Sequence, residues 1–235
     1  MRSEWHMDNE SPMILALDFP DIARTKEMIE RTSSSISIFK LGLEFFLAQG
    51  KDGVANIQNE FPDIDIFLDL KLHDIPNTVS GAAMSVAPLA PRFLTVHASG
   101  GSSMIKAATQ ALPETLVTAV TVLTSLDSDE LQAMGFPGDA QTLAVNLASR
   151  AVVAGARAIV CSPHEVGALR SQLGSTITLI TPGVRLAHSS LDDQKRVMTP
   201  SEAIAAGANY VVIGRPITQA QDPASAAREI SSSLS

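Results

Sequence analysis

Short apolar runs rich in β-branched residues recur along the chain at regular intervals. Their starting residues are spaced by about 28 residues, the size of a strand plus a helix and its loops. This spacing is typical of repeated β-α units. The predicted strands are Met13–Asp18, Ser37–Gly42, Asp65–Lys71, Arg92–Ala98, Leu116–Thr124, Ala158–Ser162, Thr178–Val184 and Tyr210–Arg215.

Between these runs lie segments with helical spacing and with Pro, Gly or Asp at their ends. The predicted helices are Pro20–Ser33, Glu44–Glu60, Pro76–Ala90, Gly101–Leu112, Asp139–Gly155, Pro163–Leu173, Pro200–Ala208 and Pro223–Ser233. A short helix or loop is expected within Leu126–Pro137.

This alternation predicts an α/β fold, a single-domain (β/α)8 barrel with parallel strands. An open doubly wound sheet is disfavoured because no GxGxxG follows the first strand. No Pro, Ser or Gly linker divides the chain. Residues 13–235 are therefore expected to form one domain, and the polar residues 1–12 a poorly ordered tail.

Composition narrows the classes of partner. The formal net charge is −8, which disfavours binding to nucleic acid or to an anionic membrane through a basic face. The sequence contains neither a secretory leader nor an uninterrupted apolar stretch long enough to span a membrane. The single cysteine, Cys161, allows no disulfide within the chain and fits a cytoplasmic protein.

Charged and hydrogen-bonding residues stand where most of the apolar runs end. In a parallel barrel these ends and the following loops carry the chemistry. Ionised side chains there are costly unless they are paired, so several of them at one end indicate a functional charge network. They are Asp18, Lys40, Asp69, Lys71, His97, Thr124, Ser162, Arg185, Gly214 and Arg215.

The densest cluster lies in the segment DLKLHDIPNT, which begins at Asp69. Because strand residues two apart share a face, Asp69 and Lys71 are expected to point into the barrel and Leu68, Leu70 and Leu72 toward the helices. A simpler interpretation makes Asp69 and Lys71 a structural pair and Asp74 a helix cap. It leaves Lys40 unexplained.

The segment DLKLHDIPNTV resembles the signature of the orotidine 5′-monophosphate decarboxylase family. Other elements of the family occur in the expected order between about Met13 and Asp222. They are LALD ending at Asp18, FKLGLE with Lys40, VHASGG at 96–101, VTVLTS with Thr124, TPGVR ending at Arg185, Gln194, and VIGRPIT with Gly214 and Arg215.

This resemblance implies decarboxylation of orotidine 5′-monophosphate at C6 to give UMP in pyrimidine biosynthesis, without a cofactor or a metal. Lys71 would stabilise and protonate the resulting carbanion. Asp69 would lie beside the substrate carboxylate. Asp74 from the partner subunit of a homodimer would complete a row of alternating charges with Lys40, Asp69 and Lys71.

The resemblance also implies how the substrate is held. Asp18 and Lys40 would bind ribose hydroxyls, joined by Thr78 of the partner chain, and Thr124 would meet the pyrimidine edge. The phosphate would be held by Arg185, Gln194, Gly214 and Arg215, since an Arg fork suits a dianion. On the residues alone, Asp18 is as well explained as a cap of the first helix.

Two other functions remain open from the sequence. One is a magnesium-dependent decarboxylase or aldolase-like enzyme acting on a keto-sugar phosphate, with Asp69 and Asp74 as ligands. The other is a catalytically silent barrel that only binds a nucleotide or phosphate. His73 and His97 are interpreted as core histidines and Cys161 as a small buried hydrophobe.

Overall fold

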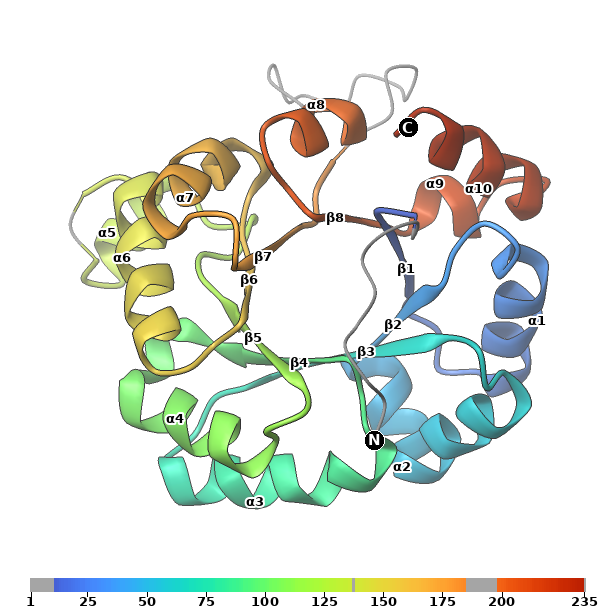
Figure 1. Ribbon diagram of the computed structural model, residues 1–235, viewed down its shortest axis with the longest axis horizontal. Helices are drawn as coiled ribbons and strands as arrows, with labels where there is room; N and C mark the ends of the chain where they lie inside the picture. Colours follow the sequence, from blue (N-terminus) through green and yellow to red (C-terminus); the bar gives the residue numbers. More distant parts are fainter. Residues whose placement is uncertain (1–10, 137, 185–197, 235) are drawn as a thin grey trace.

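The computed structural model describes residues 11–136, 138–184 and 198–234, in which eight parallel strands close into a barrel (Figure 1). Each strand pairs with the next in sequence and β8 pairs with β1. The predicted barrel is confirmed. The strands are β1 (Met13–Leu17), β2 (Ile38–Gly42), β3 (Asp65–Leu72), β4 (Phe93–His97), β5 (Leu116–Val120), β6 (Ala158–Val160), β7 (Thr178–Thr181) and β8 (Tyr210–Ile213).

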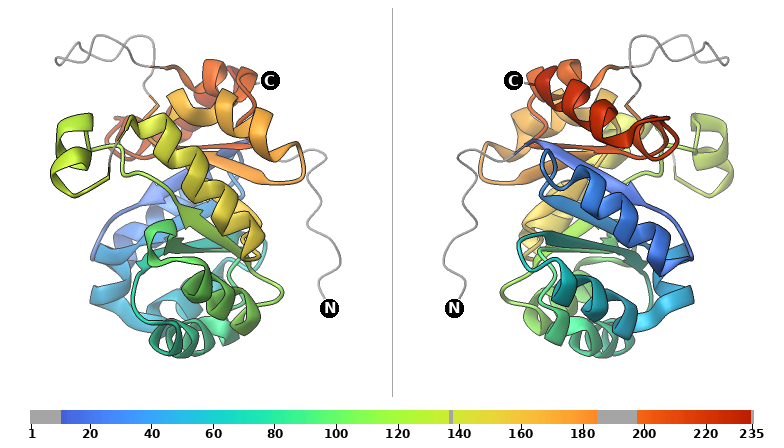
Figure 2. Two further views of the ribbon diagram at one scale, coloured as in Figure 1. Left: turned by 90° about the vertical axis from the view of Figure 1, so that its left-hand side faces the viewer. Right: turned by 90° about the vertical axis from the view of Figure 1, so that its right-hand side faces the viewer.

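Helices surround the barrel on its outside (Figures 1 and 2). They are α1 (Ile22–Thr32), α2 (Leu43–Glu60), α3 (Pro76–Val86), α4 (Ser102–Ala111), α5 (Ser128–Ala133), α6 (Ala140–Val153), α7 (Val166–Leu173), α8 (Pro200–Ala205), α9 (Arg215–Thr218) and α10 (Pro223–Ser232), with 3₁₀ turns η1 (Ala87–Leu89), η2 (Ala98–Gly100) and η3 (Pro163–Glu165). None of the helices described combines the length and apolar character needed to cross a membrane.

Side chains alternate between two apolar layers, as the strand pleat requires. On β2, Phe39 and Leu41 face the helices and Ile38 faces the barrel interior. Leu68 and Leu70 also join the outer layer, as predicted. The interior layer is made of Ile14, Ile38, Phe67, Phe93, Ala158, Ile180 and Tyr210.

Several strands end earlier than their apolar runs. β5 ends at Val120, and Val122 instead packs with Leu131 of α5 and Ala144 of α6 in a small separate cluster. Thr124 therefore lies in a loop rather than on a strand. The short helix expected in this insertion is confirmed as α5.

The boundaries near the two termini also differ from the prediction. β8 stops at Ile213, and Arg215 begins the four-residue helix α9, which the sequence did not indicate. At the other end, Pro12 accepts a hydrogen bond from the Val211 amide at 2.9 Å. The fold thus includes the last residues of the expected tail, whose residues 1–10 lie outside the described chain.

Arg92 closes the end of the barrel at which the strands begin. Its guanidinium donates to Asp65 at 2.8 Å and to the Tyr210 hydroxyl at 2.7 Å, and it lies over the rings of Phe93 and Tyr210. Only 2% of Arg92 is exposed. A buried charge is tolerated only with partners of this kind, and these contacts join the starts of β3, β4 and β8.

A buried glutamate gives the fold a testable pH dependence. Glu165 of η3 is 5% exposed and accepts a hydrogen bond from the Ser162 amide at 2.9 Å. Burial raises the pKa of Glu165 from 4.5 to about 7, partly offset by that hydrogen bond. The stability this group contributes is therefore complete below the unfolded pKa and is lost as the pH rises through the folded one.

We expect the native chain to lose stability as the pH rises from about 5 to about 8, and Glu165→Gln not to. The difference in the free energy of unfolding between the two should therefore shift in favour of Glu165→Gln by up to about 3 kcal/mol over this range. Denaturant unfolding at both pH values measures this. Glu202→Gln is the matched control, because Glu202 caps α8 in the same way but is exposed and has a lowered pKa. Equal responses of the two variants would contradict the expectation.

Candidate active site

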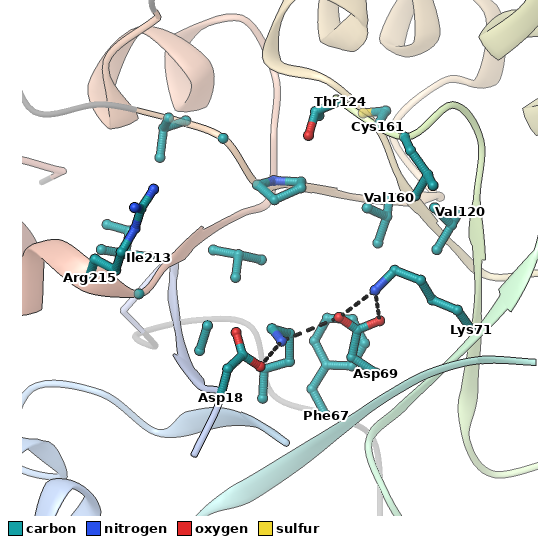
Figure 3. Close-up of a pocket in the computed structure, with 18 of the residues that line it drawn as sticks. Asp18, Phe67, Asp69, Lys71, Val120, Thr124, Val160, Cys161, Ile213 and Arg215 are labelled. Atoms are coloured by element: carbon teal, nitrogen blue, oxygen red, sulfur yellow. Dashed lines mark hydrogen bonds and ion pairs between the residues drawn. The ribbon is translucent and has the colours of Figure 1, made fainter. Parts of the chain in front are cut away.

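A pocket of about 410 Å³ lies inside the barrel at the carboxyl ends of the strands (Figure 3). Its volume is within the range of sites for small organic ligands. Apolar walls include Val120 and Val160. Of the polar side chains predicted for the site, those that line this pocket are Asp18, Lys40, Asp69, Lys71, Thr124 and Arg215.

Four of these side chains form a continuous row of alternating charge. Lys40 Nζ donates to Asp18 Oδ1 at 2.9 Å and lies 3.3 Å from Asp69 Oδ2. Lys71 Nζ contacts both oxygens of Asp69, at 2.8 and 2.9 Å. The predicted charge network is thus present, with Asp69 between two ammonium groups.

Burial and charge act in opposite directions on Asp69. Its residue is 9% exposed, and this burial alone would raise the pKa of its carboxyl. Lys40 and Lys71, together with hydrogen bonds from Lys71 and Thr95, outweigh that effect and hold the pKa of Asp69 below its usual value. Asp69 is therefore a stable carboxylate in the pocket wall.

Lys71 reaches the pocket through an irregular backbone. The predicted alternation is confirmed, since Asp69 and Lys71 line the pocket while Leu68 and Leu70 pack outside the barrel, but the backbone at Lys71 is not that of a regular strand. Lys71 has φ 47°, a left-handed conformation that residues other than glycine rarely adopt. The register between β3 and β4 shifts at this point, and the Lys71 amide donates to the Thr95 hydroxyl at 2.8 Å.

Thr95 is a site residue that the sequence reasoning missed. It is fully buried on β4 and donates to Asp69 Oδ1 at 3.0 Å while accepting from the Lys71 amide. A threonine inside a strand is usually explained by its β-branched shape. The available signal was its place two residues from Phe93, on the face that points into the barrel.

Gly42 leaves the space in which Asp18 and Lys40 meet. A Cβ atom at this position would lie 2.5 Å from Asp18 Oδ1 and 3.2 Å from Lys40 Nζ. The residue that ends β2 must therefore lack a side chain for the pair to keep its geometry.

Both helix-cap alternatives are wrong. The N-cap of α1 is Asp21, whose side chain accepts from the Arg24 amide, so Asp18 is free for Lys40. The N-cap of α3 is Ile75 and makes no side-chain cap bond. Asp74 instead accepts a hydrogen bond from the Ile75 amide at 2.6 Å.

Asp74 and Thr78 do not line the pocket of their own chain. Both are exposed, on the connection after β3 and in the first turn of α3 (Pro76–Val86). Ile75, between them, is 66% exposed. The three residues form a surface segment beside the pocket.

Of the four residues expected to bind phosphate, the structure describes Gly214 and Arg215. Arg215 lines the pocket and is exposed, next to Gly214 at the end of β8. A Cβ atom at Gly214 would lie 3.5 Å from the Ala16 Cβ, an ordinary van der Waals contact. Arg185 and Gln194 lie outside the described residues.

Cys161, His73 and His97 were interpreted from the sequence as core residues, and for His73 this was wrong. Cys161 is buried, and desolvation and the nearby Glu165 raise the pKa of its thiol to about 12. His73 is exposed rather than in the core, and its ring lies 5.3 Å from that of His97. Within the described ranges, no three His, Cys, Asp or Glu side chains are grouped to hold a metal ion.

Several known proteins similar to this chain share one name. The profile described as "Orotidine 5'-phosphate decarboxylase / HUMPS family" matches residues 11–230. Proteins named orotidine 5'-phosphate decarboxylase are 50% identical over 224 residues in Thermobifida fusca (95% of this chain, 96% of that one) and 49% identical over 220 residues in Anaeromyxobacter dehalogenans (93% and 96%). A crystal structure of that name from Lactobacillus acidophilus has a TM-score of 0.84 at 34% identity and covers 96% of this chain and 99% of its own.

We expect Gly42→Ala to fold normally and to displace the Asp18 carboxylate from Lys40, because both cannot occupy the space beside an added methyl group. Crystal structures of the variant and the native chain measure the distance between the two groups. Gly167→Ala on α7 is the control, since its added Cβ would meet nothing within 4 Å. Survival of the 2.9 Å contact in Gly42→Ala would show that the glycine is not required.

Proposed function

Since the chain belongs to the orotidine 5'-phosphate decarboxylase / HUMPS family, we propose that it converts orotidine 5′-monophosphate to uridine 5′-monophosphate and CO2 in pyrimidine biosynthesis. The observation that carries this proposal is the row Asp18–Lys40–Asp69–Lys71 beside the pocket. We further propose that the enzyme works in the cytoplasm, which its single buried cysteine suits.

Lys71 is the proposed acid of the reaction. The bond between C6 and the carboxylate carbon breaks, CO2 leaves, and the electron pair stays on C6 in the plane of the ring. An ammonium group beside C6 stabilises that charge and then donates a proton to it, forming the C6–H bond. The neutral lysine regains a proton from solvent, so that one proton is consumed for each CO2 released.

Asp69 has two proposed roles in this step. Its contacts with both lysines hold the ammonium groups in place, and its carboxylate would face that of the substrate. As CO2 departs, the substrate carboxylate loses its charge, while the attraction between Lys71 and C6 grows. Interactions that strengthen toward the transition state are those that accelerate the reaction.

The remaining predicted residues are proposed to hold the nucleotide. Asp18 and Lys40 would bind ribose hydroxyls, and Thr124 would meet the pyrimidine edge at the loop after β5. Gly214 and Arg215 would bind the phosphate with Arg185 and Gln194. The exposure of Arg215 at the pocket rim suits a dianion that enters from solvent.

A homodimer with shared active sites is part of the proposal. Asp74 and Thr78 are exposed and do not line their own pocket, and the apolar Ile75 beside them is also exposed. A two-fold contact through this segment would place both polar side chains at the neighbouring site and cover Ile75. Asp74 would then extend the row of charges beyond Lys71.

The magnesium-dependent alternative fits the geometry less well. Both oxygens of Asp69 already contact ammonium groups, so binding a divalent cation there would require displacing them. A barrel that only binds a ligand has no use for an Asp69–Lys71 pair whose carboxylate is buried and costly to desolvate.

We expect Lys71→Ala to lower the rate of decarboxylation by on the order of a thousandfold or more, because the charge and the proton donor at C6 are both lost. The fall in ultraviolet absorbance of orotidine 5′-monophosphate measures the rate. Lys51→Ala, an exposed lysine on α2, is the control. All assays contain EDTA, so a native enzyme that is active only after Mg²⁺ is added would support the magnesium-dependent alternative.

Mixing two inactive variants tests the shared site. In a hybrid of Lys71→Ala and Asp74→Ala chains, one of the two sites contains a native Lys71 and a native Asp74. We expect random exchange to restore about a quarter of native activity, since about half the dimers are hybrids with one intact site each. Hybrids of Lys71→Ala with Asp69→Ala are the control and stay inactive, because both groups come from one chain. Exchange confirmed by native mass spectrometry without recovery would place Asp74 in its own site.

A further inference from the structure

We infer that Thr95 is a positioning residue for the decarboxylation, holding Lys71 and Asp69 in their reactive arrangement through a single hydroxyl group. This inference rests on the proposed function. Thr95 lies on β4, does not line the pocket, and is fully buried behind the two charged side chains.

The hydroxyl has a fixed direction. A threonine hydroxyl donates one hydrogen bond and has lone pairs to accept others. The Lys71 amide, at 2.8 Å, can only donate, and the ionised Asp69 oxygen, at 3.0 Å, can only accept. The hydroxyl proton must therefore point at Asp69, and its lone pair at the Lys71 backbone.

The backbone of Lys71 needs this support. In the register of the two strands, Leu68 pairs with Leu94 and Leu72 with Val96. Asp69, Leu70 and Lys71 therefore lie opposite Thr95 alone, and Lys71 takes the disfavoured φ of 47°. Across this irregularity Lys71 Nζ contacts both oxygens of Asp69. A left-handed residue other than glycine persists only where its surroundings hold it.

Loss of the hydroxyl would thus affect two groups at once. The Lys71 amide would lose its acceptor, so that the side chain would sample positions away from C6. Asp69 would lose one of its donors. Small displacements of a reacting group reduce rate far more than they reduce binding, so the expected effect is on kcat rather than on nucleotide affinity.

The test compares Thr95→Val, which keeps the shape without the hydroxyl, with Thr95→Ser, which keeps the hydroxyl. We expect Thr95→Val to lower kcat by roughly tenfold to a hundredfold and Thr95→Ser by less than about threefold. The Kd of UMP, measured by calorimetry, should change by less than about threefold in both. Thr118→Val is the matched control. Thr118 lies on β5, pairs with Thr95 and is equally buried, but its hydroxyl donates to the Leu116 carbonyl rather than to a charged residue of the site.

The pH profile provides a readout that a purely structural role would not move. Asp69 faces Lys40 and Lys71, and the hydrogen bond from Thr95 helps to lower its pKa. Without that bond the acidic limb of kcat should move to higher pH in Thr95→Val and stay in place in Thr118→Val.

Wild-type kcat in Thr95→Val, or equal losses in Thr95→Val and Thr118→Val, would overturn the inference. If Thr95→Val fails to fold, Thr95→Ala takes its place beside Thr95→Ser, with the same expected loss. A native protein that does not decarboxylate orotidine 5′-monophosphate would refute the proposed function instead. Crystal structures of Thr95→Val would then test the role of Thr95. We expect Lys71 to leave its position against Asp69 in this variant, and an unchanged Lys71 would overturn the inference.

Discussion

The site depends on one carboxylate that is held between two ammonium groups. Asp69 is the only acidic side chain of the row that is buried, and each buried or half-buried lysine beside it needs that charge to remain in an apolar barrel. Lys40 is shared with the exposed Asp18, whereas Lys71 contacts Asp69 alone within the row. Removing Asp69 would leave the two ammonium groups without the carboxylate that lies between them, and Lys71 without a partner in the row.

The barrel and the site place different demands on β3. A regular strand would continue its pairing with β4 to the end, whereas the site uses the Lys71 ammonium against both oxygens of Asp69. The structure satisfies both by keeping the ladder regular through Leu68 and breaking it afterwards. Thr95 hydrogen-bonds to the backbone at the break. The resulting strain is confined to Lys71, and Leu72 returns to register with Val96.

Much of this arrangement could be predicted from the spacing of the apolar runs and from the pleat of a strand. Periodicity indicated eight strands and helices, and alternation placed Asp69 and Lys71 inside. Properties that depend on contacts between distant segments could not be read in this way. Thr95 and Arg92 look ordinary until β3, β4 and β8 are assembled, and the ends of β5 and β8 depend on what packs against the following residues. Asp18 was ambiguous for the same reason, since its partner is 22 residues away.

The Arg92 cluster lies far along the barrel from the row of charges, and this separation bears on how the sequence can evolve. The barrel is fixed at the end where its strands begin by Arg92, Asp65 and Tyr210, whereas the row of charges occupies the other end. Substitutions that alter the choice of ligand can therefore accumulate in the loops at the carboxyl ends without loosening the closure of the sheet. The division makes the fold a tolerant scaffold for the divergence of substrate specificity.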